Sequence, residues 1–220
     1  MVNTNFIIDF DSTFVQVEAL DELATIALKD AIDKDEIVSQ IKGITELGMD
    51  GLITFSDSLS RRLALFSISK EHIQQLILLL QSRISTSFTR NEAFFKTHSE
   101  HIYIISGGFK EYIAPIVMKF GIPESHILAN EFIFDTNGFV TGYDTKSFLS
   151  QANGKVLQVQ ALNLVGDVVV IGDGYTDYQI RESGNATTFF AFTENISRQA
   201  VINKSDYVAS RLEDIIIHVG

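Results

Sequence analysis

Residues 4–13, Thr-Asn-Phe-Ile-Ile-Asp-Phe-Asp-Ser-Thr, contain a short apolar run that ends directly in acidic residues. The run from Phe6 to Ile8 is typical of a buried strand, and we expect it to open the fold. Asp9 and Asp11 are two positions apart, so in an extended segment their side chains project to the same side. Two carboxylates so close repel each other, so either a cation lies between them or one of them is protonated. An aspartate-rich turn or helix cap is the simpler alternative for this pattern alone.

The composition is that of an ordinary globular chain. It has 220 residues, 45% hydrophobic and 20% charged, which allows one domain or two small ones. The absence of cysteine excludes a disulfide, a thiolate zinc site and a cysteine nucleophile. A formal net charge of −11 disfavours nucleic acid and anionic membrane surfaces as partners. No targeting signal and no membrane-spanning apolar run are visible, so we expect a soluble, cytoplasmic protein.

The hydrophobic period changes along the chain and predicts an α/β fold. From about residue 18 to residue 82, apolar residues recur at helical spacing. Beyond that block, apolar strands alternate with helical segments, and the continuous apolar run at 167–171 is typical of a strand buried in a parallel sheet. The other segments predicted there are a helix at 109–120 and strands at 101–105, 126–129, 132–134, 139–141, 187–192 and 207–209.

This alternation predicts a three-layer α/β sandwich with a mostly parallel, Rossmann-like sheet. The helical block is too long to be a loop between two strands. We therefore expect a helical cap subdomain at residues 14–82, inserted into a catalytic core formed by residues 1–13 and 83–220.

Three predicted strands end in polar segments, and ligands of open α/β sheets bind beyond the carboxyl ends of the strands. Residues 106–108 (Ser-Gly-Gly) precede a helix, where a hydroxyl and free backbone N–H groups can hold an anion. Asp173 and Asp177 follow the 167–171 strand, and together with the first acidic pair they offer the oxygen ligands that suit Mg²⁺. Each segment alone is also an ordinary turn or a capped helix start.

Other catalytic patterns are absent from the sequence. The five histidines have no ligand spacing, and neither a Gly-x-Ser-x-Gly elbow nor a P-loop is present. Lys155 is a surface lysine by default, and its functional interpretation is a fixed positive charge beside a phosphate.

The order of these residues resembles the haloacid dehalogenase superfamily, whose marks are Asp-x-Asp-x-Thr, Ser/Thr, Lys and Gly-Asp-x-x-x-Asp. The matching residues are Asp9, Asp11, Thr13, Ser106, Lys155, Asp173 and Asp177. The residues within the motifs resemble those of the phosphoserine phosphatase branch of that superfamily. They read Asp-Phe-Asp-Ser-Thr, Ser-Gly-Gly-Phe and Gly-Asp-Gly. The resemblance implies a Mg²⁺-dependent phosphoric monoester hydrolase that converts O-phospho-L-serine to serine and phosphate, as in serine biosynthesis.

The resemblance also implies roles at the reacting phosphate. Asp9 would be the nucleophile that forms an aspartyl-phosphate, and Asp11 would protonate the leaving oxygen and then activate water. The implied metal ligands are Asp9, Asp11 through its carbonyl, and Asp173, with Asp177 orienting metal waters or Lys155. The implied phosphate-binding residues are Ser106, Gly107, Lys155 and Thr176.

Within the expected cap, the resemblance assigns Glu18 to the substrate ammonium and Arg62 to its carboxylate, with Met49 and Phe55 as an apolar lining. Plain structural roles are open for all of these: a glutamate in a first helical turn, a solvated arginine and two core side chains.

The sequence departs from the phosphoserine phosphatase pattern at Thr176, where asparagine is usual, and at the bulky Tyr175. A hydroxyl offers one donor where an amide offers two, so the preferred substrate stays open. The alternatives are a phosphatase or phosphotransferase acting on another small amine or amino-acid phosphate and, less favoured, a phospho-accepting signalling module without hydrolytic activity. The sequence does not indicate an oligomeric state.

Overall fold

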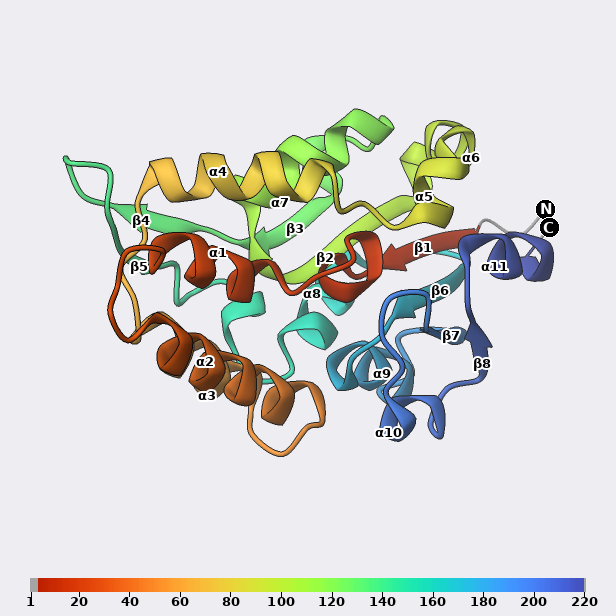
Figure 1. The fold of residues 1–220 in the computed structure, drawn as a ribbon. Helices are drawn as coiled ribbons and strands as arrows, with labels where there is room; N and C mark the ends of the chain where they lie inside the picture. The colour runs from red at the N-terminus through yellow and green to blue at the C-terminus, as the bar shows by residue number, and fades with distance from the viewer. Residues whose placement is uncertain (1–3, 220) are drawn as a thin grey trace.

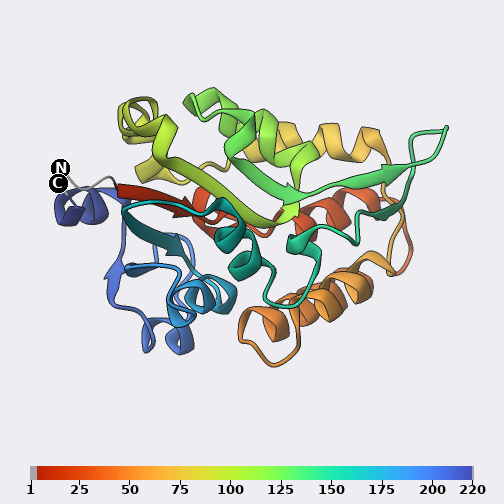
Figure 2. The same ribbon diagram turned by 180° about the vertical axis from the view of Figure 1, so that it is seen from behind.

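The computed structural model describes residues 4–219 and is built on a six-stranded sheet in the order β3-β2-β1-β6-β7-β8 (Figures 1 and 2). All neighbouring strands of this sheet are parallel. The strands are β1 (Thr4–Ile8), β2 (Ile102–Phe109), β3 (Ile127–Asn130), β6 (Asp167–Gly172), β7 (Thr188–Phe192) and β8 (Tyr207–Ala209). Strand order reverses between β1 and β6, and such a switch point opens a crevice at the carboxyl ends of the strands.

Helices cover both faces of the sheet, so the expected three-layer α/β architecture is confirmed. Phe6 and Ile8 of β1 face one apolar cluster, whereas Ile7 between them faces the other, as the two-residue period of a strand requires. The first face is covered by α5 (Thr86–Arg90), α6 (Glu92–His98), α7 (Lys110–Val117) and α11 (Leu212–Val219). The second face is covered by α8 (Gly154–Leu162), α9 (Tyr175–Glu182) and α10 (Gln199–Ile202).

The segment predicted to be a cap contains four helices, as its helical spacing indicates. They are α1 (Ala19–Ala27), α2 (Lys34–Met49), α3 (Phe55–Leu63) and α4 (Lys70–Gln81). α4 packs against both α1 and the core helix α7, while α2 and α3 lie on the far side of α1 (Figure 1). Val15 and Ile84 form an antiparallel bridge, so the two crossings between core and cap lie side by side. We keep the word cap for residues 14–82.

A small antiparallel hairpin, β4 (Phe132–Phe134) and β5 (Val140–Tyr143), extends from the core as predicted. Its turn is closed by Asp135, whose Oδ1 accepts the N–H groups of Asn137 and Phe139. Across residues 4–219, no helix combines the length and the apolar character needed to cross a bilayer.

Candidate active site

Asp9 lies at the carboxyl end of β1, where the buried strand opens into an irregular turn. Its backbone N–H donates to the carbonyl of Ile171 at 3.0 Å, so the hydrogen bonding between β1 and β6 continues one residue past the end of β1. Its Oδ1 accepts the N–H of Phe10 at 2.7 Å. Ser12 then adopts the left-handed region at φ 52°, which turns the chain away from the sheet. The carboxylate is thereby fixed at the mouth of the switch point.

Asp9, Asp173 and Asp177 form a buried carboxylate cluster. One oxygen from each lies within 4.8 Å of the others, and Thr13 Oγ1 donates to Asp173 Oδ1 at 3.1 Å. Three carboxylates converging in a buried place need a compensating cation, and hard oxygen ligands suit Mg²⁺. The donor set therefore fits the implied metal. The side chain of Asp11 is not part of this cluster.

Lys155 supplies the positive charge inside the cluster. Its Nζ lies 2.7 Å from Asp9 Oδ1 and 2.7 Å from Asp177 Oδ1. Burial alone would lower the pKa of Lys155, but the two carboxylates outweigh burial and raise it, so the amine stays charged. The segment before it is tightly built, because a Cβ on Gly154 would lie 2.3 Å from the carbonyl oxygen of Phe148. Only glycine fits there, and Lys155 follows at the start of α8.

Asp11 points the other way, toward the cap. Its Oδ1 accepts the N–H of Ala19 at 2.7 Å, at the start of α1. Burial, together with the nearby charge of Asp9, raises the pKa of Asp11 to about 7. A carboxyl with such a pKa can both give and take a proton near neutral pH. Its environment therefore suits an acid–base role better than a metal-ligating one.

The Ser-Gly-Gly segment ends β2 beside these carboxylates. Ser106 Oγ accepts the N–H of Gly108 at 2.9 Å and is fully buried. A Cβ on Gly107 would lie 2.3 Å from the ring of Phe55, which is at the start of α3. The absence of a side chain at Gly107 is therefore what allows the cap to pack directly onto this strand exit.

The core and cap residues meet around one cavity of about 40 Å³. Nine of the residues singled out in the sequence line it: Asp9, Asp11, Glu18, Met49, Phe55, Arg62, Gly107, Lys155 and Thr176. Ser106, Asp173 and Asp177 are buried but are not among the lining residues. The cavity thus has charged groups on both its core side and its cap side.

Comparison with known proteins gives the family of this chain. The family model of the haloacid dehalogenase-like hydrolases matches residues 6–181. The chain belongs to this hydrolase family. The hydrolase is 29% identical over 214 residues to a chloroplastic phosphoserine phosphatase of Arabidopsis thaliana, covering 94% of this chain and 69% of that protein. It is 27% identical over 212 residues to the phosphoserine phosphatase of Homo sapiens, covering 94% and 89%.

Solved structures agree with this placement. A phosphoserine phosphohydrolase-like protein from Francisella tularensis is 33% identical, with a TM-score of 0.89 over 99% of this chain and 100% of that one. A substrate-bound phosphoserine phosphatase complex, 22% identical, shares the fold with a TM-score of 0.78 over 99% of each chain. The resemblance stated from the motifs is therefore confirmed, and the hydrolase is a phosphoric monoester hydrolase.

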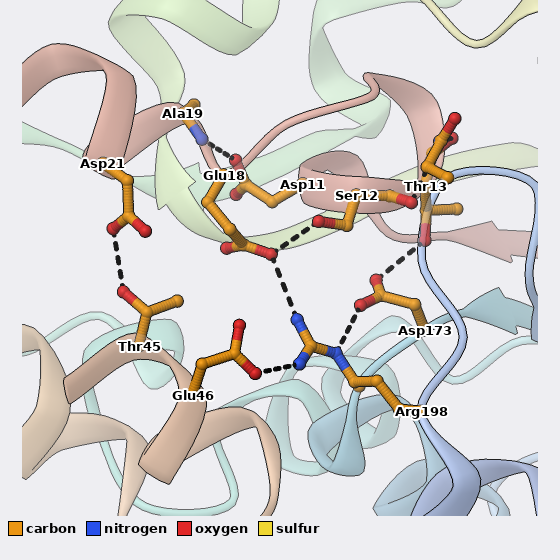
Figure 3. Close-up of polar contacts among 12 residues, drawn as sticks. Asp11, Ser12, Thr13, Glu18, Ala19, Asp21, Thr45, Glu46, Asp173 and Arg198 are labelled. Carbon is orange, nitrogen blue, oxygen red and sulfur yellow. Dashed lines mark hydrogen bonds and ion pairs between the residues drawn. The ribbon is translucent and has the colours of Figure 1, made fainter. Parts of the chain in front are cut away.

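Arg198 is a residue of the hydrolase that the sequence did not single out. Its guanidinium lies between three carboxylates (Figure 3): Nε donates to Asp173 Oδ2 at 3.1 Å, NH1 to Glu46 Oε2 at 2.6 Å, and NH2 lies 3.7 Å from Glu18 Oε1. Asp173 belongs to the core, whereas Glu18 and Glu46 belong to the cap. One buried arginine thus joins the carboxylate cluster to the cap.

The position of Arg198 offers a signal that could have led to it. It lies in the segment between β7 and α10, beyond the carboxyl end of a fourth parallel strand. Asn195 in the same segment donates to the carbonyl of Ser12 at 3.0 Å and to Ser85 Oγ at 2.7 Å, which supports the turn after β1. A search of every strand exit, and not only the glycine-bearing ones, would have included both residues.

Glu18 is a partly buried acid on the cap side of the hydrolase, and we predict that it makes the free energy of unfolding depend on pH. Ser12 Oγ donates to Glu18 Oε1 at 2.7 Å, yet burial and then the charge of Asp11 raise its pKa to about 8. The folded state thus holds this proton more tightly than the unfolded chain, whose ordinary value is 4.5. The stability from this group is full below pH 4.5 and is lost as the pH rises through 8.

The variant Glu18→Gln has no such proton to lose. In urea unfolding with EDTA, we expect the wild type to lose stability relative to the variant between pH 5 and pH 8.5, by on the order of 3 kcal/mol. A difference between the two proteins that stays constant across this range would contradict the raised pKa.

Proposed function

We propose that this hydrolase cleaves O-phospho-L-serine into serine and phosphate through an aspartyl-phosphate intermediate. The observation that carries the proposal is that Glu18 and Arg62 line the same cavity as Asp9 and Asp11. A substrate with a phosphate at one end and an ammonium and a carboxylate at the other would find Lys155 for the phosphate, the carboxyl oxygens of Glu18 for the ammonium and Arg62 for the carboxylate. The phosphoserine phosphatases among the relatives support this choice of substrate. A cytoplasmic location is part of the same proposal.

In the first step, a carboxylate oxygen of Asp9 attacks phosphorus, and the bond from phosphorus to the seryl oxygen breaks. Asp11 gives its proton to the departing oxygen, which its raised pKa permits near neutral pH. In the second step, Asp11 takes a proton from water, whose oxygen attacks the aspartyl-phosphate and releases phosphate and Asp9. Dividing the reaction into two displacements makes each one easier.

Charge on the phosphoryl oxygens must be neutralised throughout both steps. Lys155 is held against Asp9 and stays protonated, so it provides a fixed positive charge there. Ser106 and the Gly107 N–H would donate hydrogen bonds to phosphate, and Thr176 lines the cavity from the start of α9. Mg²⁺ held by Asp9, Asp173 and the Asp11 carbonyl would add further positive charge at the phosphoryl group. Asp177 accepts from Lys155 and from the Gly174 N–H, which supports its assignment to orienting Lys155.

The substrate proposal is tested by comparing O-phosphoserine with phosphoethanolamine, which lacks the carboxylate, in a phosphate-release assay. We expect a preference of roughly 10- to 100-fold in kcat/KM for phosphoserine, because a charge-assisted hydrogen bond contributes about 1.5–3 kcal/mol. Arg62→Ala should remove this preference and leave phosphoethanolamine turnover nearly unchanged. Both activities should require Mg²⁺ and disappear with EDTA.

The same assay separates the alternatives. Arg61 is the matched control for Arg62, because it lies on the same helix, α3, but pairs with the exposed Asp57. Arg61→Ala should therefore keep the preference for phosphoserine. Equal turnover of both substrates by the wild type would contradict phosphoserine as the substrate and favour another small amine phosphate. Phosphorylation of the protein without continued phosphate release would favour a phospho-accepting module.

A further inference from the structure

Three buried polar side chains meet inside the cap, one from each of its first three helices. Asp21 lies on α1, Thr45 on α2 and Arg62 on α3. They are 5%, 2% and 5% exposed. A buried polar group lowers stability unless it is paired, and a buried charge more so. Neither Asp21 nor Thr45 belongs to the carboxylate cluster, so this group needs its own explanation.

The hydrogen bonds of the three side chains connect Arg62 to Asp21 through Thr45, whose hydroxyl also lies 3.1 Å from the carbonyl oxygen of Ile41, a second and more distant acceptor for its one proton. Arg62 NH1 donates to Thr45 Oγ1 at 3.2 Å, and Thr45 Oγ1 donates to Asp21 Oδ1 at 2.8 Å, as Figure 3 shows for the last pair. Arg62 NH1 also lies 3.9 Å from Asp21 Oδ1. A hydroxyl has one proton and two lone pairs, so Thr45 can accept from the arginine and donate to the aspartate together. The positive charge of Arg62 and the negative charge of Asp21 favour this order, in which the hydroxyl donates to the carboxylate.

These contacts hold two of the three nitrogens of the guanidinium. Arg62 Nε donates to the carbonyl of Ser58 at 3.4 Å, and NH1 is held by Thr45. The described hydrogen bonds and ion pairs place no protein acceptor on NH2, and Arg62 lines the same cavity as Asp9. The planar fork of an arginine suits a carboxylate only when it is correctly oriented. A fork held beforehand also loses less rotamer freedom when the ligand binds.

We propose that Asp21 and Thr45 are positioning residues that make the enzyme selective for a substrate carboxylate by orienting Arg62. This inference rests on the proposed function and deepens it, because it assigns the selectivity to a chain of three residues and not to Arg62 alone. Asp21 has an ordinary alternative role in the first turn of α1, where acids are favoured. Its side chain nevertheless points across to α2 and α3 (Figure 3).

The test measures kcat/KM for phosphoserine and for phosphoethanolamine in four variants. Thr45→Val replaces the hydroxyl with a methyl group of similar size. Asp21→Asn removes the negative charge that accepts the hydrogen bond of Thr45. Each should reduce the preference for phosphoserine by roughly tenfold, with phosphoethanolamine turnover kept. Thr45→Ser retains the hydroxyl and should retain the preference. Thr25→Val is the matched control, since Thr25 lies on α1 and donates only to the main chain of Asp21.

A second measurement separates positioning from a general effect on the fold. In an Arg62→Ala background, Thr45→Val should have no further effect on the preference, because the two residues act through one contact. Phosphoethanolamine turnover shows in every variant that the protein is folded. A wild type without any preference would overturn both this inference and the proposed function. A wild-type preference that survives in both Thr45→Val and Asp21→Asn would overturn this inference alone.

Discussion

Asp9→Asn is expected to abolish turnover while the protein stays folded. The amide has the shape of the carboxylate but is not a nucleophile toward phosphorus, so we expect kcat to fall by on the order of 10⁴-fold or more. The fold should tolerate the change because the cluster is crowded with like charges. Burial raises the pKa of Asp11 and of Asp173, and the charge of Asp9 raises both further, for Asp173 after the charge of Glu18, so removing the charge of Asp9 relieves repulsion. Lys155 retains Asp177 as a partner.

The measurement is phosphate release, combined with intact-mass detection of the phosphorylated protein after acid quenching. The wild type should gain one phosphoryl group and Asp9→Asn none. Asp167→Asn is the matched control, because Asp167 is exposed at the amino end of β6, the opposite edge of the sheet, and it should behave as the wild type. Substantial turnover by Asp9→Asn, or a phosphoryl group on it, would place the nucleophile elsewhere.

Arg198→Met is expected to have the second largest effect, on both stability and activity. Without the guanidinium, the buried Asp173 would lose this positive partner, and removing one member of a buried ion pair typically destabilises by about 3–5 kcal/mol. The side chain of Arg198 is 4% exposed and that of Asp173 is 1% exposed, so solvent cannot replace the lost charge. We also expect kcat/KM to fall by at least roughly 100-fold, because Asp173 keeps its contact with Thr13 but loses the charged group that orients its other oxygen.

The Glu46 end of this contact provides an internal comparison. Glu46 pairs with Arg198 at 2.6 Å, but its side chain is 55% exposed. Glu46→Gln should therefore change the free energy of unfolding by less than about 1 kcal/mol in urea titrations. Arg198→Lys should restore part of the stability but not all the activity, because an ammonium cannot reproduce the fork. Equal effects of Arg198→Met and Glu46→Gln would mean that the contact with Asp173 contributes little.

The strand exits could be predicted from the sequence because their signals are local. An apolar run that stops at Asp9, and another that stops before Asp173, identify both the strands and the edge where they end. The general rule for parallel sheets then brings these exits together without any knowledge of the structure. Gly107 and Gly154 are local signals too, because at both positions a Cβ would collide with a neighbouring atom and only glycine fits.

Other features depend on contacts between distant parts of the chain. Arg198 reaches the site because β7 pairs beside β6 and because α2 lies over that edge, and no local pattern records either fact. The contact of Thr45 with Asp21 depends on the rotation of two helices relative to each other. α5 and α6 were not expected at all, because helices of 5 and 7 residues are too short to establish a period.

The bridge between Val15 and Ile84 affects where the sequence of this enzyme can tolerate insertions and deletions. The inserted segment leaves and re-enters the core at one place, so its ends are joined by the core whatever lies between them. The entropy of closing such a loop grows only slowly with the number of residues, by about 0.6 kcal/mol for each doubling. Length changes in the loops of this segment, away from α4 and its packing on the core helix α7, can therefore leave the register of the sheet unaltered. Substrate preference and catalysis can accordingly diverge separately within one chain.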